Sequence, residues 1–128
     1  MKIQMMFLTL LLSTLCVAFT YTSTSSKIKV DKLEHDFGII AQGNPSTATF
    51  TLTNHADQPM VLKKVKGSCG CTATSYESEP IAPGAKTQIE ATYNAKSVGK
   101  FTKTVSVYTN LIDEPIVLTL TGIVEAVK

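Results

Sequence analysis

The stretch from Thr47 to Thr53 reads TATFTLT, with apolar and polar residues in strict alternation. Successive side chains of a β-strand point to opposite faces, so this period of two places the apolar residues on one face and the threonines on the other. A helix would instead require apolar residues every three or four positions. The stretch therefore predicts a half-buried strand whose apolar face consists of Ala48, Phe50 and Leu52.

The same alternation recurs three times towards the C-terminus. The apolar faces of these further predicted strands are Ile89, Ala91 and Tyr93; Phe101, Val105 and Val107; and Ile116, Leu118 and Leu120. Residues 33–40 and 60–65 are rich in apolar and β-branched residues and predict two more strands. Pro83-Gly84 is typical of a type II turn, in which proline fixes one φ angle and glycine supplies a positive one.

Six or seven short strands with no helical stretch between them predict an all-β fold. A parallel sheet built from consecutive strands requires crossover helices, so we expect a single antiparallel β-sandwich of about seven strands. The usual signature of an immunoglobulin domain, a buried tryptophan beside a disulfide that joins the two sheets, is absent from this sequence. The chain has no Trp, and Cys69 and Cys71 are separated by a single residue.

Length and charge exclude several classes of protein. The chain has 128 residues, 44% of them hydrophobic, which indicates one globular domain and not a disordered or two-domain protein. Twelve basic residues, all of them lysine, face ten acidic residues, for a net charge of +2. A nucleic-acid-binding domain usually has a strong basic excess and uses arginine for base and phosphate contacts. We therefore expect no nucleic-acid partner.

The N-terminus predicts export. Between Lys2 and Thr20 lies an uncharged apolar run of roughly 15 residues, which is short for a membrane span and suits the core of a secretory signal peptide. Cys16 lies near the end of this run, but Leu15 replaces the small residue that normally precedes a lipidated cysteine. We therefore expect a cleaved signal peptide and a periplasmic or secreted product, with a lipid-anchored or membrane-anchored form as the less favoured alternative.

The predicted domain organisation has three parts. Residues 1–20 form the signal peptide, residues 21–30 a polar tether, and residues 31–128 the β-sandwich domain. After cleavage we expect no membrane attachment. The sequence gives no indication of an oligomeric state.

Cys69-Gly70-Cys71 is the one motif that indicates chemistry. In an extended strand, the Cα atoms of residues two apart lie about 6.6 Å from each other, and their side chains point to the same face. This spacing is near the upper end of the Cα separations found in disulfides. Such a bridge closes almost no loop and would stabilise the fold very little. A structural disulfide, a labile redox pair and a metal site that uses Cys69 and Cys71 as soft thiolate ligands for Cu(I) or zinc all remain open.

Other residues add little to these candidates. His35 and His55 are the only nitrogen ligands after the signal peptide, and their spacing from the cysteines matches no structural zinc motif. We therefore name no confident metal ligand. Gly-x-Cys-Gly around Cys69 superficially matches the nucleophile segment of chymotrypsin-like cysteine proteases, but those enzymes need two β-barrels and this chain supports one small domain. We expect no catalytic residues and no cofactor.

Short motifs follow one another in a characteristic order along residues 33–124. They are Glu34 to Ile40 with Gly43, Phe50 to Asn54, Pro59 to Val65, Ser68 to Thr72, Pro80 to Gly84, Tyr93-Asn94, Gly99 to Phe101, Thr109-Asn110 and Leu118 to Gly122. His-Asp-Phe-Gly followed at this distance by Ser-Cys-Gly-Cys-Thr is a specific combination, whereas the first motif alone would be weak. This order of motifs resembles the bacterial domain-of-unknown-function family 1573.

This resemblance implies an immunoglobulin-like sandwich related to the Hydin-type and major sperm protein domains. It implies that Gly38 lets the first strand change sheets, that Phe37 enters the core, and that Cys69 and Cys71 end the third strand. His35 and the cysteines would then lie towards opposite ends of the sandwich. The resemblance also implies location in the bacterial envelope, but it brings no established activity.

The sequence therefore favours an exported, non-catalytic immunoglobulin-like module that binds a protein or an envelope component through its sheet edges and loops. The alternative is a thiol redox or Cu(I)-binding site at Cys69-Gly70-Cys71.

Overall fold

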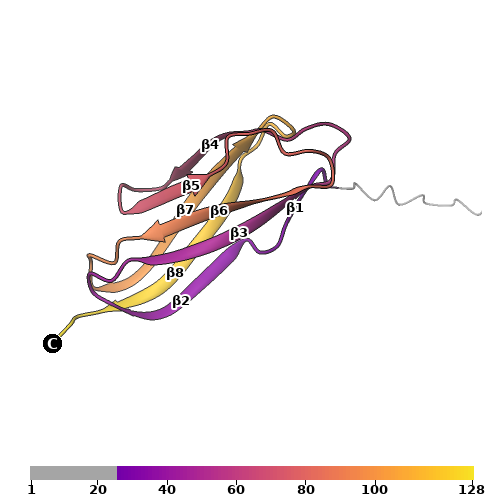
Figure 1. The fold of residues 1–128 in the computed structure, drawn as a ribbon. Helices are drawn as coiled ribbons and strands as arrows, with labels where there is room; N and C mark the ends of the chain where they lie inside the picture. Colours follow the sequence, from indigo (N-terminus) through magenta and orange to yellow (C-terminus); the bar gives the residue numbers. More distant parts are fainter. Residues whose placement is uncertain (1–25) are drawn as a thin grey trace, which may run out of the picture.

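The computed structural model describes residues 26–128, which form two four-stranded β-sheets packed face to face (Figure 1). One sheet has the strand order β1-β3-β6-β5 and the other has the order β2-β8-β7-β4. The strands are β1 (Ile28–Val30), β2 (Glu34–Ala41), β3 (Ser46–Asn54), β4 (Leu62–Gly67), β5 (Thr72–Tyr76), β6 (Lys86–Tyr93), β7 (Gly99–Thr109) and β8 (Ile116–Glu125).

The all-β immunoglobulin-like fold and the four strands with alternating residues are confirmed. Residues 33–40 and 60–65 also lie largely within strands, as β2 and β4. Pro83-Gly84 forms the expected turn, because Gly84 has a φ of 79° and the Ala85 amide donates to the Ala82 carbonyl at 2.9 Å. Within residues 26–128 there is no helix long and apolar enough to cross a membrane.

The N-terminal boundary differs from the sequence prediction. Residues 28–30, assigned above to a polar tether, form strand β1, and Ile28 is buried in the core. The folded part therefore begins three residues earlier than predicted and contains eight strands. The predicted signal peptide at residues 1–20 and the start of the tether, including Cys16, lie outside the described residues.

The first strands also correct two details of the predicted topology. Strand β1 pairs antiparallel with β3, whereas β2 pairs with β8 in parallel, so the sandwich is not wholly antiparallel. This parallel pair needs no crossover helix, because strands β3 to β7 form the connection between β2 and β8. The chain changes sheets between Val30 and Glu34 and not at Gly38, which instead forms a bulge in β2 with a φ of 66°.

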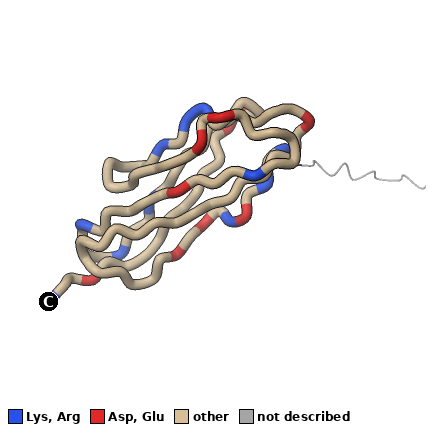
Figure 2. Tube along the Cα trace, viewed as in Figure 1, with Lys and Arg blue, Asp and Glu red and all other residues tan. Residues whose placement is uncertain are grey.

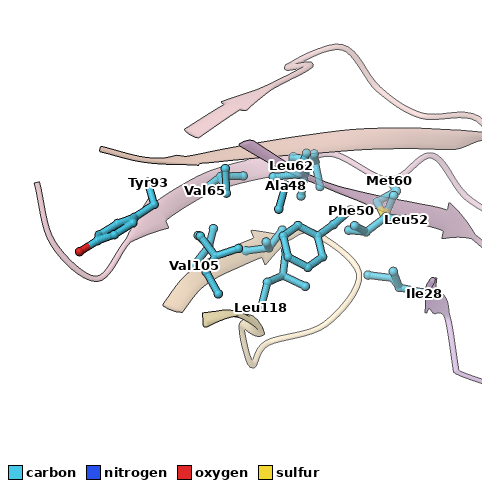
Figure 3. Close-up of a cluster of buried hydrophobic side chains, with 14 of the residues drawn as sticks. Ile28, Ala48, Phe50, Leu52, Met60, Leu62, Val65, Tyr93, Val105 and Leu118 are labelled. Atoms are coloured by element: carbon cyan, nitrogen blue, oxygen red, sulfur yellow. The ribbon is translucent and has the colours of Figure 1, made fainter. Parts of the chain in front are cut away.

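The core lies between the sheets, where the predicted apolar faces of β3, β6, β7 and β8 meet (Figure 3). Phe50, Leu52 and Ile89 are completely buried. At one end, Tyr93 in β6 stacks on Phe101 in β7 with ring centroids 4.0 Å apart, which joins the two sheets. Burial of each such side chain contributes roughly 1.5–3 kcal/mol to the stability of the fold.

Candidate functional site

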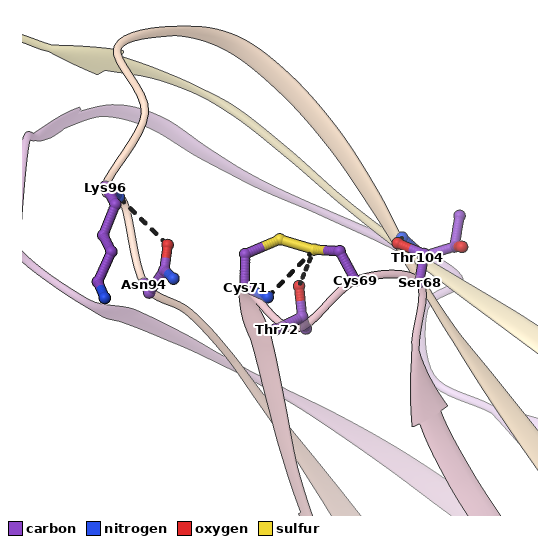
Figure 4. Close-up of a disulfide and its surroundings, with 7 residues drawn as sticks. All are labelled: Ser68, Cys69, Cys71, Thr72, Asn94, Lys96 and Thr104. Carbon is purple, nitrogen blue, oxygen red and sulfur yellow. Dashed lines mark hydrogen bonds between the residues drawn. A yellow bond between two sulfur atoms is a disulfide. The ribbon is translucent and has the colours of Figure 1, made fainter.

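The Cys-Gly-Cys motif forms the tight connection between β4 and β5, which belong to different sheets (Figure 4). Cys69 and Cys71 are joined in a disulfide with their Cα atoms 5.2 Å apart, and both side chains are half-buried. Gly70 between them is exposed. The family resemblance implied that Cys69 and Cys71 end the third strand, and this is wrong: they follow β4, which ends at Gly67, and lie in the connection to β5.

Hydrogen bonds attach both ends of the motif to the neighbouring strands β7 and β6. Before the motif, the Ser68 amide donates to the Thr104 carbonyl at 2.8 Å, and the Thr104 amide donates to Ser68 Oγ at 3.1 Å. At the end of the motif, the Asn94 amide donates to the Cys71 carbonyl at 3.0 Å. The connection is thus attached to β7 in one sheet and to the end of β6 in the other.

Gly67 allows the two strands to approach each other closely. A Cβ atom at this position would lie 2.7 Å from the Thr72 carbonyl oxygen and 3.1 Å from Thr72 Cβ. The first of these distances is shorter than real side chains adopt, so only glycine fits. The close approach of residues 67 and 72 folds the intervening residues into the turn that brings the two cysteines together.

The disulfide contributes little to the stability of the fold. Its ring spans a sequence separation of 2. The chain-entropy relation for a loop this short gives about 1.5 kcal/mol, compared with about 3 kcal/mol for a 15-residue loop. Most of the conformation of the connection is fixed by Gly67 and by the hydrogen bonds to β6 and β7. A role as a structural staple is therefore a weak explanation for the pair.

The chain segments that hold the disulfide carry lysines and no acidic residues. The two segments that hold it, residues 60–76 and 94–112, contain no Asp or Glu. Their lysines are Lys63, Lys64, Lys66, Lys96, Lys100 and Lys103. Figure 2 shows blue stretches along β4, where three of them lie. Positive charge near a cysteine favours its thiolate form over the thiol.

Neither histidine lies near the disulfide. His55 follows the end of β3, whereas the cysteines lie level with its beginning, since Thr72 and Ser46 both pair with Tyr93. His35 is level with the motif along the strands but in β2, the opposite edge of its sheet from β4.

The register gives the separation of His35 from the motif. His35 pairs with Leu120 in β8, and Leu120 pairs with Lys103 in β7, next to the Thr104 that binds Ser68. Three strand spacings separate the two edges, roughly 14 Å. The expectation that His35 and the cysteines lie at opposite ends is therefore wrong: they lie at opposite edges of one sheet, because β8 and β7 lie between β2 and β4.

Within the part of the chain that the structure describes, no third metal ligand lies beside the cysteines. Among residues 26–128 no group of three or more His, Cys, Asp or Glu side chains is arranged to hold a metal ion. Cys69 and Cys71 are bonded to each other, so neither sulfur is a thiolate ligand in this state.

His35 has its own local environment at the edge of the core. Its ring packs edge-on against Phe37, with centroids 4.7 Å apart, and Phe37 is partly buried against the core as the resemblance implied. Lys32 Nζ lies 3.0 Å from His35 Nδ1, and because a lysine ammonium can only donate, Nδ1 must accept. Burial lowers the pKa of His35, nearby Lys32 lowers it further, and Asp36 partly opposes the shift.

Stability should fall in mild acid because of His35. Since the folded-state pKa of His35 lies below the unfolded value of about 6.5, the unfolded chain binds a proton first as the pH decreases. The contribution of the neutral ring is complete above that value and is lost as the pH falls through the folded-state pKa. Urea unfolding of the parent and of His35→Gln at pH 7.5, 6.5 and 5.5 checks this: the parent should lose more stability. Equal losses would contradict it.

Sequence reasoning found the two cysteines but missed the residues that hold them. Ser68 and Thr72 flank the motif, and their hydrogen-bonding side chains were a local signal that could have been used. Thr104 and Asn94 are distant in sequence, and only the strand order brings them to the motif. Gly67 lies two residues beyond the strand predicted at residues 60–65, but the sequence does not show that Thr72 packs so closely against it that only glycine fits.

Solved structures share this fold at low sequence identity. PapD-like domain 7 of human CEP192 is 11% identical with a TM-score of 0.70, covering 91% of this chain and 100% of that chain. A protein of unknown function from Porphyromonas gingivalis W83 is 13% identical with a TM-score of 0.65, covering 81% of this chain and 51% of that one, so the chain spans about half the length of that protein. WR4, a Caenorhabditis elegans member of the MSP family, is 12% identical with a TM-score of 0.51, covering 79% and 100%.

These likenesses establish an immunoglobulin-like sandwich of the PapD and MSP kind, and they transfer no activity. No curated protein matches the chain. The family described as "Protein of unknown function (DUF1573)" matches residues 28–124, which begins at the first residue of β1. The chain belongs to this family.

Proposed function

We propose that this chain is an exported, non-catalytic immunoglobulin-like module that binds another protein by adding a strand of that protein to the edge of β5. Export is supported by the uncharged apolar run that follows Lys2. Binding at β5 is supported by a comparison of the sheet edges among the described residues. The absence of hydrolytic catalysis is supported by the distance of both histidines from the half-buried cysteines, because neither ring can act as the base for a cysteine nucleophile.

Three of the four sheet edges have features that discourage pairing with another chain. Strand β1 is three residues long. Strand β2 is interrupted by the bulge at Gly38. Strand β4 carries exposed lysines at positions 63, 64 and 66. Short edge strands, bulges and edge lysines are the devices by which natural sheets avoid edge-to-edge association.

Strand β5 lacks these devices, and this observation carries the proposal. Its sequence is Thr-Ala-Thr-Ser-Tyr, with no charge, no proline and no bulge in its pairing with β6. The Cys71 carbonyl points towards β6, where it accepts from Asn94. Because the backbone groups of successive residues in a strand point to alternate sides, those of Thr74 and Tyr76 point towards the free edge.

The ends of β5 define where a partner would bind. At the disulfide end the strand lies against β4, since Thr74 Oγ1 donates to the Val65 carbonyl at 3.2 Å. At the other end Tyr76 has 37% of its surface exposed. Tyrosine is enriched in protein interfaces because it offers a large contact area together with a polar hydroxyl. An extended segment of a partner that pairs beside Tyr76 would gain main-chain hydrogen bonds and this aromatic contact.

The test uses photo-crosslinking in the cells that make the protein. A photoreactive amino acid replaces exposed Ser75 in β5 or, as the control, exposed Lys29 in β1, which lies at the opposite edge of the same sheet. We expect discrete adducts with a protein from position 75 and not from position 29. The same adducts from both positions, or none from position 75, would contradict binding at this edge.

A second variant separates pairing of the backbone from contact with the side chain. Tyr76→Pro removes an outward-pointing amide, which an edge strand tolerates, whereas Tyr76→Ala removes the same side chain and keeps the amide. If the partner adds a strand, the crosslink from position 75 should decrease further in Tyr76→Pro than in Tyr76→Ala. Equal decreases would indicate binding through the side chain alone.

A further inference from the structure

The connection that holds the disulfide does not depend on the disulfide for its shape. Ser68 is bound to Thr104, the Cys71 carbonyl accepts from Asn94, and the Thr72 amide donates to the Cys69 carbonyl at 3.3 Å. None of these hydrogen bonds involves a sulfur atom. Opening the disulfide would therefore leave two thiols facing each other in the same turn, without unfolding of the strands on either side.

The two sulfur atoms have different surroundings. The Cys71 amide lies 3.3 Å from Cys69 Sγ and donates to it, and Thr72 Oγ1 lies 3.9 Å from the same atom (Figure 4). Among the described residues no hydrogen bond reaches Cys71 Sγ. Donors stabilise a thiolate, so negative charge is better accommodated on Cys69 than on Cys71.

The disulfide is also accessible to a reactant. Both cysteines are half-buried and not enclosed, and a Cβ atom built on Gly70 would meet no atom within 4 Å. A thiol can therefore approach the bridge over Gly70. The lysines of the two neighbouring segments, with no acidic residue among them, favour the approach of an anionic thiolate.

We propose that the Cys69–Cys71 disulfide is a directional thiol-exchange site: a thiolate attacks Cys71, Cys69 is the leaving group, and the substrate class is a dithiol that becomes oxidised. The proposal rests on the donors at Cys69, the accessibility over Gly70 and the hydrogen bonds that preserve the turn. It does not require binding at the edge of β5: confirmed exchange would overturn only the non-catalytic part of the proposed function, and failed exchange would leave strand addition at β5 unaffected.

The exchange balances in two steps. In the first step a substrate thiol loses its proton and its sulfur attacks Cys71 Sγ; the bond between the two cysteines breaks, and its electron pair passes to Cys69, where the Cys71 amide and the Thr72 hydroxyl hold the new thiolate. In the second step the other substrate thiolate attacks the substrate sulfur of this mixed disulfide and displaces Cys71. The substrate gains a disulfide, and its two protons and two electrons end on Cys69 and Cys71 as thiols.

A pair of single-cysteine variants tests the asymmetry. Cys71→Ala keeps the Cys69 thiol with both donors, and Cys69→Ala keeps the Cys71 thiol without them. The measurement is the rate of alkylation by iodoacetamide at pH 7, with each variant compared with its own urea-unfolded form so that exposure is accounted for. We expect the Cys69 thiol to react roughly tenfold faster than the Cys71 thiol. Equal rates, or a faster Cys71, would overturn the proposed direction.

Reduction of the intact protein tests the exchange itself. The probe is dithiothreitol, the simplest dithiol, and alkylation followed by intact mass counts the thiols formed. The folded protein should be reduced within roughly tenfold of the rate of its urea-unfolded form, with its circular dichroism spectrum unchanged. A rate more than roughly a hundredfold slower, or reduction that requires unfolding, would show a structural disulfide and overturn the proposal.

The hydroxyl of Thr72 provides a matched control for the role of the donor. Thr72 is 7% exposed, and Thr72→Val removes the hydroxyl with little change in volume, whereas Thr72→Ser keeps the hydroxyl. Reduction by dithiothreitol should be roughly threefold slower in Thr72→Val than in Thr72→Ser. Equal rates in the two variants would show that Thr72 does not stabilise the leaving thiolate and would leave the Cys71 amide as its only donor, contradicting the proposed pair.

Discussion

Asn54→Ala should lower the free energy of unfolding by about 3 kcal/mol. Asn54 is completely buried at the end of β3. Its Nδ2 donates to the Gln58 carbonyl at 2.9 Å and to the Ile81 carbonyl at 3.0 Å, and its Oδ1 accepts from the Ala56 amide at 2.9 Å. Alanine would remove a partner from all three backbone groups. The Ile81 carbonyl keeps the Met60 amide, whereas the Gln58 carbonyl and the Ala56 amide lose their bond to the side chain. A buried polar group that loses its partner costs roughly 1–3 kcal/mol.

A second asparagine provides the matched control. Asn110 also joins two segments, because its Oδ1 accepts from the Val61 amide at 2.7 Å and its Nδ2 donates to the Pro59 carbonyl at 3.0 Å. Asn110 is exposed, so water can replace its bonds after substitution. Urea unfolding of both variants measures the difference, and we expect Asn110→Ala to cost about 1 kcal/mol or less. Equal losses would mean that burial of Asn54 does not set the cost.

The strands that the sequence predicted best are those that bury one complete face. The alternation at Thr47 to Thr53 reads directly as strand β3, because Phe50 and Leu52 are fully buried and the threonines face outwards. The same relation holds in β6, β7 and β8. Where one face packs against a core and the other meets water, the period of two is imposed on the sequence itself.

The sequence did not predict strands β1 and β5, which form strands because they pair with β3 and β6. The outer residues of β5 are small or polar, and the strand depends on its hydrogen bonds to β6. Strand β1 has three residues that pair with the end of β3. At the candidate site the same limit applies: the spacing of Cys69 and Cys71 is a local signal, whereas their contacts with residues 94 and 104 follow from the strand order.

Gly38 was predicted to mark a change of sheet, but it forms a bulge within β2. A glycine with a positive φ is compatible with either, and the sequence contains no signal that distinguishes them. The chain crosses between the sheets at residues 31–33, where the Asp31 amide donates to the Thr51 carbonyl and Asp31 Oδ1 accepts from the Thr51 amide. Gly38 instead places its carbonyl oxygen against β8, at the position of Gly122.

Gly122→Ala should lower the free energy of unfolding by about 2–3 kcal/mol through overpacking. A Cβ atom at position 122 would lie 2.8 Å from two atoms of the Phe101 ring and 3.0 Å from the Gly38 carbonyl oxygen. The Phe101 ring cannot easily move away, because it is buried and stacks on Tyr93 at 4.0 Å. The new methyl group would therefore force either the ring away from Tyr93 or β2 away from β8.

Gly70→Ala separates this packing effect from the general effect of replacing a glycine. A Cβ atom at Gly70 would meet nothing within 4 Å, and neither Gly70 nor Gly122 has a positive φ, so backbone strain does not distinguish the two positions. Gly70→Ala should change stability by about 0.5 kcal/mol or less. Urea unfolding measures both variants, and near-ultraviolet circular dichroism monitors the stacked Tyr93. If Gly122→Ala left both signals unchanged, the contact of β8 with Phe101 and Gly38 would not be as close as the geometry requires.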